Sequence, residues 1–268
     1  MNLLTCVSRS AVIVLALLLC ARFAGAETFR VVTYNVEGYL DKATQTRSVK
    51  SAEAKTKVRE SIHALKPDVL ALQEMGTTNA LLELRNSLKA EGLDLPYWEH
   101  VAGLDTNIHV AILSKFPFSD RRPRTDDSFL LSGRRYRVSR GFAEVDVQVN
   151  TNYSFTLIAA HLKSKRAVGQ ADEAELRLEE AKLLREKIDA RLAANPAVNL
   201  VVLGDFNVSK DSPSTKAVIG RGKRKLLDTR PTERNGDNAQ TTNSAWELRK
   251  VTWTHYYGKE DTYSRIDF

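Results

Sequence analysis

Five short polar signatures stand at the ends of predicted strands, and this arrangement limits the folds open to the chain more than any other feature. They are TYNV, LALQE, AAHLKSKR, VVLGDFN and SRIDF. The segments before them are rich in β-branched and aromatic residues, which is typical of buried strands. Because helices interrupt these strands and hairpins occupy the middle of the chain, the pattern predicts a layered α/β (α+β) sandwich.

The periodicity of apolar residues places the individual elements. Amphipathic helices are predicted at Ser51–Leu65, Ala80–Leu88 and Gln170–Ala194. Loops are predicted at Lys210–Thr215 and Thr232–Ser244. Strands are predicted at Phe29–Val36, Val69–Gln73, His109–Leu113, Tyr136–Val149, Tyr153–His161, Val198–Leu203 and from Val251 onward. No repeat or linker divides the chain, so residues 27–268 are expected to form one domain.

The first 26 residues have the features of a secretory signal peptide. Arg9 precedes the apolar run Ala11–Leu19, and Ala24-Gly25-Ala26 offers a small-residue cleavage site. The run is shorter than the ~20 residues that a membrane-spanning helix needs. We therefore expect an exported protein, periplasmic or secreted, without a stable membrane anchor. Both cysteines lie in this leader, which excludes disulfides, thiolate nucleophiles and cysteine-ligated zinc from the mature chain.

The chain is moderately basic, with 40 lysine and arginine residues against 33 acidic ones and a net charge of +7. Much of the excess is clustered, which suits a polyanionic partner. Solvated loops are the alternative explanation for any single cluster. The clusters are Arg121, Arg122, Arg124; Arg134, Arg135, Arg137, Arg140; Lys163, Lys165, Arg166; and Arg221, Lys223, Arg224, Lys225.

The segment Val201–Asn207 carries the most specific chemistry. It is an apolar strand that stops at Gly204 and then presents Asp205 and Asn207. Residues two apart on extended backbone point the same way, so both side chains can address one ligand. A carboxylate activates water or binds a hard cation, and an amide holds a phosphoryl oxygen without adding charge. A turn with an Asx cap is the structural alternative.

Three further polar residues follow predicted strands. Glu74 is either a rim residue or an oxygen ligand for a divalent ion, and Asn35 is either a ligand or a turn cap. His161 is followed by Lys163 and Lys165, and a histidine that takes up a charge beside lysines suits a phosphate. A structural histidine is the alternative there. We take Lys163, Lys165 and Arg140 as candidate substrate contacts.

The motifs TYN, QE, HLKS, GDFN and SRID, in this order, resemble those of the endonuclease/exonuclease/phosphatase superfamily, the deoxyribonuclease I-like metal-dependent phosphoesterases. Trp253-Thr254 and Leu113–Pro117 add to the likeness, which covers residues 29–268. The resemblance implies a four-layer αββα sandwich with the site at one edge of two packed sheets.

The resemblance also implies a role for each motif residue. Glu74 would be the main ligand of Mg²⁺ or Mn²⁺, with Ca²⁺ as a further alternative, and Asn35 would lie close to the metal. Asp205 would orient or deprotonate the attacking water, and Asn207 would hold the phosphate. His161 would stabilise the charge of the transition state or assist the leaving group.

Asp267 would orient a second histidine, supplied in this superfamily by a later Ser-Asp-His segment. The sequence ends at Phe268, so we expect that it is truncated, that the last strand is missing, and that turnover is weak or absent. A second departure is Asn107–Ala111, where similar enzymes often have Arg-Gly-Ile-Asp-Val-Ala, so an acidic group beside the site is expected to be missing.

The substrate stays open at this point. A nuclease cutting phosphodiester bonds of DNA or RNA is our first hypothesis, and we expect it to act as a monomer. The alternatives are a phosphatase or phosphodiesterase acting on lipid headgroups, inositol phosphates or nucleotides, and an inactive relative that only binds nucleic acid. The chain lacks the long aromatic hairpin expected of a membrane-inserting sphingomyelinase.

Overall fold

The computed structural model describes residues 28–169, 171–229 and 253–268. The predicted signal peptide, the predicted loop Thr232–Ser244 and the start of the last predicted strand at Val251 lie outside these residues. No helix in the described ranges is both long and apolar enough to cross a lipid bilayer.

The described helices are α2 (Ala52–Leu65), α3 (Thr78–Ala90), α4 (Glu173–Ala194) and α5 (Pro213–Ile219), with a short 3₁₀ turn, η2, at Gly222–Arg224. The described strands are β1 (Val31–Tyr39), β2 (Val69–Met75), β3 (Tyr97–Val101), β4 (His109–Ser114), β5 (Phe118–Arg121), β6 (Ser128–Leu131), β7 (Arg134–Arg137), β8 (Phe142–Asn150), β9 (Tyr153–His161), β10 (Leu200–Asp205), β11 (His255–Tyr257) and β12 (Thr262–Ser264).

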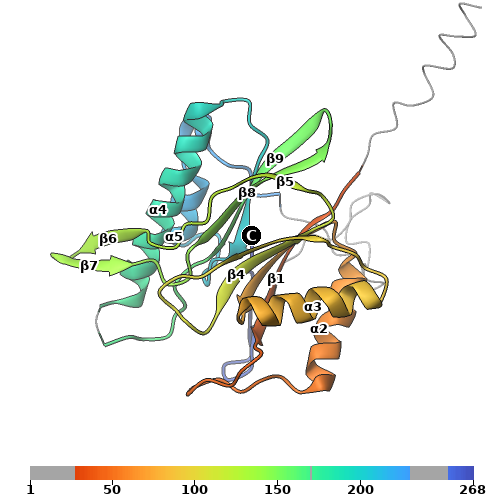
Figure 1. The fold of residues 1–268 in the computed structure, drawn as a ribbon. Helices are drawn as coiled ribbons and strands as arrows, with labels where there is room; N and C mark the ends of the chain where they lie inside the picture. The colour runs from red at the N-terminus through yellow and green to blue at the C-terminus, as the bar shows by residue number, and fades with distance from the viewer. Residues whose placement is uncertain (1–27, 170, 230–252) are drawn as a thin grey trace, which may run out of the picture.

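Two four-stranded sheets, ordered β1-β2-β4-β3 and β10-β9-β8-β5, form the centre of the described molecule. Helices α2 and α3 cover the outside of the first sheet, and α4 and α5 cover the outside of the second (Figure 1). The predicted four-layer αββα sandwich is therefore confirmed.

The apolar runs are continuous because their strands are buried on both faces. In β2, Leu70 and Leu72 pack toward α2 and α3, whereas Val69 and Ala71 pack between the sheets. The same alternation occurs in β9, where Ile158 faces α4. Side chains that alternate across a strand thus fill two separate cores.

Most predicted elements are present with small shifts at their ends, and β9 begins and ends where predicted. The predicted strand Tyr136–Val149 is wrong in one respect, because residues 138–141 separate β7 from β8. Gly141 causes this break. Its φ of +68° is left-handed, and a Cβ there would lie 2.6 Å from the carbonyl oxygen of Arg124.

The predicted loop Lys210–Thr215 is also wrong, since α5 begins at Pro213. Ser212 caps this helix by accepting a hydrogen bond from the Thr215 N–H, and the proline occupies its first turn. The β6–β7 hairpin was not predicted either. Its strands have four residues each, and β7 is mostly exposed and carries arginines in place of an apolar pattern.

Gly204 allows β10 to lie against β9. Its φ is +138°, and a Cβ at this position would lie 1.9 Å from the carbonyl oxygen of Ala160. Any side chain must therefore push the two strands apart just before Asp205.

We expect Gly204→Ala to lower the free energy of unfolding by about 3 kcal/mol or more, because backbone strain and a backbone clash add. Gly133→Ala is the matched control, since Gly133 has a φ of +76° but nothing within 4 Å of the added Cβ. Urea unfolding of both variants measures the difference. Equal losses in the two variants would contradict the close approach at Gly204.

Candidate active site

The predicted site residues come from strands of both sheets that end at one edge of the sandwich. His161 and Asp205 are the last residues of β9 and β10, and the parallel pairing of these strands places them directly opposite each other. Asn35 lies in β1 and is paired with Gln73 of β2, next to Glu74. Residues far apart in the sequence are therefore brought together by strand register.

Asp205 is the centre of this arrangement. The side-chain amide of Asn35 donates to its Oδ2 at 2.9 Å, and the backbone N–H of Asn207 donates to its Oδ1 at 2.7 Å. His161 Nε2 lies 3.7 Å from Oδ2. The bond from Asn35 crosses from one sheet to the other, so the carboxylate joins the two halves of the sandwich.

Asp267 pairs with Asp205 on the side of β10 that is opposite to β9 and His161. Residues 266–268 run antiparallel along β10, with backbone hydrogen bonds between Gly204 and Phe268 and between Phe206 and Ile266. The backbone N–H of Asp267 donates to Thr254 Oγ1. Within the described residues, its carboxylate oxygen Oδ1 is buried without a hydrogen-bond partner.

The two carboxyl groups resist ionisation. Burial, together with the negative charge of Asp205, raises the pKa of Asp267 to about 7. Burial also raises the pKa of Asp205, and Glu74 adds to this effect, although the hydrogen bonds from Asn35 and Asn207 oppose it. The site therefore concentrates negative charge that its own donors compensate only in part.

Glu74 is held in an unusual backbone conformation. Its φ is +60°, and the pairing of β2 with β4 shifts register between Leu72 and Met75. Arg47 NH1 contacts Glu74 Oε2 at 2.8 Å. Asn207 is also left-handed, with a φ of +59°. Such strain is common at functional sites, where it aims a side chain that regular strand geometry would turn away.

His161 is buried, and burial lowers its pKa well below the usual value, with Arg140 and Arg47 adding to the effect. The imidazole is therefore neutral near pH 7. This differs from the charged histidine expected beside Lys163 and Lys165. A neutral imidazole can still donate a hydrogen bond to an oxygen.

The three predicted substrate contacts lie in different surroundings. Arg140 is buried and donates to the carbonyl of Leu162 at 3.2 Å. The ammonium of Lys163 donates to the carbonyls of Ser164 and Arg166, so it holds its own loop. Lys165 is exposed. Arg140 is thus the only one of the three whose charge acts on both His161 and Asp205.

Sequence reasoning missed Glu180, which organises the loops around His161. It is buried within α4, where Oε1 accepts from the backbone N–H and the hydroxyl of Ser139, and Oε2 accepts from the Lys163 N–H at 2.6 Å. The Glu180 carboxylate thus fixes Ser139, which precedes Arg140, and Lys163, which lies two positions after His161. The sequence did contain a clue to Glu180. It lies four residues from both Leu176 and Leu184, which places it on the apolar face of the helix.

Arg47 was also missed, since it stands in a loop without a motif. The absence of an acidic group at Asn107–Ala111 stays a prediction, although Asp105 stands four residues before His109. Asp105 Oδ2 lies 3.7 Å from Arg140 Nε, and its Oδ1 accepts from the N–H of Asn107. His109 itself packs edge-on against His100 at 4.9 Å.

The site suits a hard divalent cation bound largely through water. Within the described ranges, no group of three or more His, Cys, Asp or Glu side chains is placed to hold a metal by itself. The possible oxygen ligands are partly engaged, since Asn35 Oδ1 accepts from the Glu37 N–H at 2.8 Å and Glu74 Oε2 pairs with Arg47. The second oxygen of Glu74 suits Mg²⁺, which is typically held by one or two carboxylates with several waters. The partly uncompensated charge of Asp205 and Asp267 favours a cation nearby. These residues fit the predicted metal.

Comparison with known families agrees with this geometry. The sequence profile described as "Endonuclease/Exonuclease/phosphatase family" matches residues 32–268. The chain belongs to the endonuclease/exonuclease/phosphatase family. The search of curated proteins gave no match.

Solved structures share the fold of this family member at low sequence identity. Beta toxin from Staphylococcus aureus, a F277A, P278A mutant crystallised with bound magnesium ions, is 17% identical, with a TM-score of 0.59 over 90% of this chain and 83% of that chain. Sphingomyelinase C from Streptomyces griseocarneus is 19% identical, with a TM-score of 0.51 over 72% and 69%. ANGEL2, a 2′,3′-cyclic phosphatase, is 19% identical, with a TM-score of 0.50 over 70% and 56%.

We expect Glu180→Gln to lower the free energy of unfolding by about 1–3 kcal/mol, because an amide NH₂ would face an N–H donor at one of the two oxygen positions. Urea unfolding measures this. Glu179→Gln is the matched control, since Glu179 only pairs with Lys182 near the surface and should change stability by less than about 0.5 kcal/mol. Equal effects of the two changes would contradict the role of Glu180.

Proposed function

We propose that this chain is an exported metal-dependent phosphoesterase that hydrolyses phosphodiester bonds of DNA or RNA by metal-assisted attack of water. The observation that carries the proposal is the buried Asp205, held by Asn35 and Asn207 between His161 and Asp267. Export rests on the leader sequence. Membership of the endonuclease/exonuclease/phosphatase family supports action on a phosphate ester.

Each residue has a task that its surroundings suit. A raised pKa makes the carboxylate of Asp205 a better base for a water molecule, and its two hydrogen bonds fix its orientation. Neutral His161 would donate a hydrogen bond to a phosphate oxygen. Asn207, whose amide nitrogen donates to the Leu162 carbonyl at 2.9 Å, would contact the phosphate from a fixed position. Glu74 and Asn35 would hold the divalent cation, which neutralises charge on the phosphate oxygens when bound.

Arg47 and Arg140 supply positive charge beside the carboxylates. Arg47 contacts Glu74, and both arginines act on His161. A phosphate that enters the site therefore meets two guanidinium groups as well as the cation, which suits an anion bearing charge on several oxygens. Arg121, Arg122 and Arg124 are ion-paired with acidic residues, so the support for a polyanionic substrate is the net charge of +7.

Two other functions would use the same fold. The similar structures include a sphingomyelinase and a cyclic phosphatase, so lipid headgroups, inositol phosphates and nucleotides are alternative substrates. An inactive nucleic-acid-binding protein is the other alternative. Parallel assays with plasmid DNA, RNA, nucleotides and sphingomyelin vesicles distinguish them.

We expect the protein to cleave supercoiled plasmid DNA or RNA with Mg²⁺ and not with EDTA. The assay uses enzyme in excess over substrate, so that slow cleavage is detected. Asp205→Asn and His161→Ala should each reduce the rate about a hundredfold or more, because each removes a group at the reacting phosphate. Asp94→Asn, an exposed change far from the site, is the control. Near-normal cleavage by either site variant would disprove the site, and binding without any cleavage would favour the inactive relative.

The raised pKa of Asp267 predicts that ionising this carboxyl group lowers the free energy of unfolding as pH rises. Its usual pKa is 3.8 and its folded value is about 7, so the folded state keeps a proton that the unfolded state loses. Stability is therefore lost as pH rises from about 4 to about 7. Asp267→Asn removes this cost, so the variant should be more stable than the wild type near about pH 8, and the difference should vanish near about pH 4.

Mg²⁺ should narrow this difference at the higher pH, because a bound cation compensates the same negative charge. Urea unfolding at both pH values, with and without Mg²⁺, measures it. Asp94→Asn should show no such pH dependence, since Asp94 is exposed and pairs with Lys89. A stability difference for Asp267→Asn that is the same at both pH values would contradict the coupling between Asp267 and Asp205.

A further inference from the structure

An exposed aromatic cluster lies on the β11–β12 hairpin. Tyr256 and Tyr263 stand directly opposite each other in the two strands, with ring centroids 4.8 Å apart. The Trp253 ring meets Tyr263 edge-on at 5.1 Å. The three side chains are 49%, 58% and 46% exposed. Large aromatic rings grouped on a surface in this way mark an interaction site more often than isolated exposed residues do.

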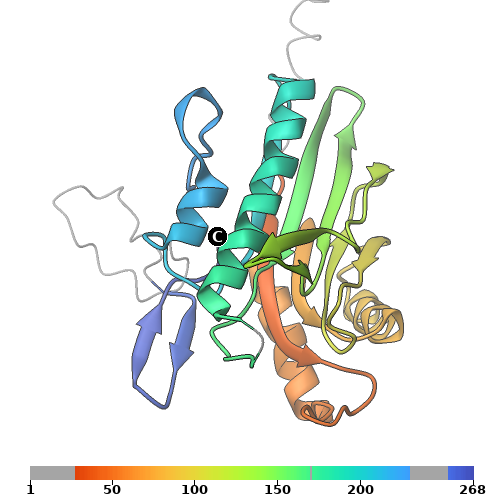
Figure 2. The same cartoon turned by 90° about the vertical axis from the view of Figure 1, so that its left-hand side faces the viewer.

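The other face of the hairpin is also exposed. His255 and Tyr257 alternate with Tyr256 and stack on each other at 6.5 Å. Figure 2 shows the hairpin projecting from the sandwich, with neither face packed against a sheet. The aromatic rings are therefore not core residues of the described fold. The chain thus has an aromatic hairpin, but a short one with three residues in each strand, and not the long hairpin whose absence was expected.

The hairpin begins and ends at the active site. Thr254 Oγ1 accepts hydrogen bonds from the N–H groups of Ile266 and Asp267, and its own N–H donates to the Ser264 carbonyl. The base of the aromatic hairpin is thus bonded to the segment that carries the carboxylate of Asp267.

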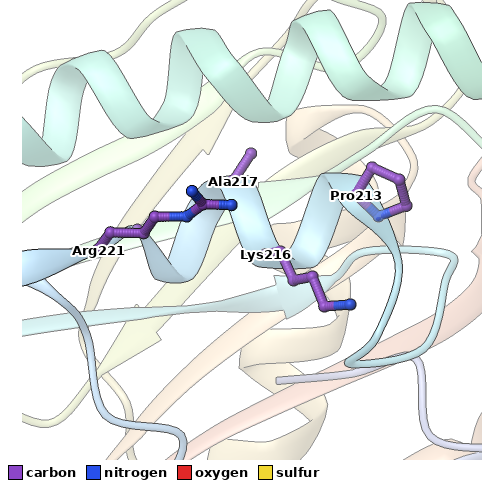
Figure 3. Close-up of a pocket in the computed structure, with 5 residues that line it drawn as sticks. Pro213, Lys216, Ala217 and Arg221 are labelled. Carbon is purple, nitrogen blue, oxygen red and sulfur yellow. The ribbon is translucent and has the colours of Figure 1, made fainter.

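A basic groove adjoins the same region. It runs along α5 and η2 and is lined by Lys210, Lys216, Arg221 and Lys225. Figure 3 shows the Arg221 side chain beside Ala217 and the Lys216 side chain extending from the opposite side of α5. Lys210 stands three residues after Asn207, so the groove begins beside the site.

The acidic residues of the groove do not cancel this charge. They are Asp211 and Asp228, and Asp228 forms a two-pronged ion pair with Arg265 at 2.7 and 2.8 Å. Arg265 directly follows β12, so this ion pair also ties the groove to the base of the hairpin. The base of the aromatic hairpin and the basic groove are therefore joined through this ion pair.

We infer that these two surfaces bind a single-stranded segment of nucleic acid, with bases stacked on Trp253, Tyr256 and Tyr263 and phosphates along the groove. The inference rests on the proposed phosphodiesterase function of the neighbouring site and names its substrate form. Aromatic platforms beside a cationic groove are the general means of binding single strands. A duplex keeps its bases stacked on one another and offers them no free faces, so it should bind more weakly.

The test measures equilibrium binding of a fluorescent oligothymidylate of about 12 nucleotides to the protein in EDTA, so that no cleavage occurs. Tyr256→Ala/Tyr263→Ala should weaken binding about tenfold or more, because each stacked base contributes strongly. Tyr256→Phe/Tyr263→Phe keeps the rings and should bind normally. Tyr97→Ala/Tyr153→Ala, at exposed tyrosines elsewhere, is the matched control.

The contribution of the basic groove is measured separately, through the salt dependence of oligonucleotide binding. Lys216→Gln/Arg221→Gln should weaken binding and reduce the slope of log affinity against log salt by roughly one to two. Lys57→Gln/Lys89→Gln, on α2 and α3 at the opposite outer layer, should leave the slope unchanged. Circular dichroism confirms that each variant is folded.

Three results would overturn the inference: equal affinity for single and double strands, undiminished binding by the folded tyrosine-to-alanine variant, and tyrosine-dependent binding to sphingomyelin vesicles without binding to the oligonucleotide. Hydrolysis of bis(4-nitrophenyl) phosphate by the wild type tests the proposed function separately. If the wild type binds the oligonucleotide but does not hydrolyse bis(4-nitrophenyl) phosphate, the proposed phosphodiesterase function is refuted and the inferred binding surface is not.

Discussion

The hydrogen bond from Asn35 to Asp205 is the contact on which the candidate site depends. It joins an amide of one sheet to a carboxylate of the other, at the edge where β1 and β10 end. Burying a carboxylate is costly unless donors compensate it, and Asn35 and Asn207 do so in part. His161 is placed by its register with Asp205, and Asp267 by its pairing beyond β10.

The charges of the buried carboxylates around this hydrogen bond are balanced only in part by nearby donors. Burial raises the pKa of both Asp205 and Asp267, with the charge of Glu74 adding to the effect at Asp205 and the charge of Asp205 adding to it at Asp267. Arg47 and Arg140 lie near enough to lower the pKa of His161. The proposed function uses this arrangement, with a cation at the carboxylates and a phosphate at the guanidinium groups. Glu180 keeps the surrounding loops in place from within α4.

The parts that could be predicted from the sequence share one property: their residues carry a local signal. β9 was predicted to the residue because its apolar run follows the turn residues Asn150-Thr151-Asn152 and ends at the polar His161. Helix α5 was missed although Ser212 and Pro213 are a typical helix start, and the β6–β7 hairpin has no apolar alternation to reveal it. Arg47 and Glu180 act through tertiary contacts alone, so motif reading passed over both.

The sequence by itself determined a layered α/β sandwich and the motif residues, because apolar strands and polar strand ends are local properties. The resemblance of those motifs to a known family implied the four layers. Only the tertiary structure decided that Asn35 bonds Asp205, that burial keeps His161 neutral, and that Lys163 holds its own loop. The reason is that hydrogen-bond partners, burial and charge separation depend on residues distant in the chain. The same holds for the aromatic hairpin and the basic groove, which become neighbours only when Arg265 meets Asp228.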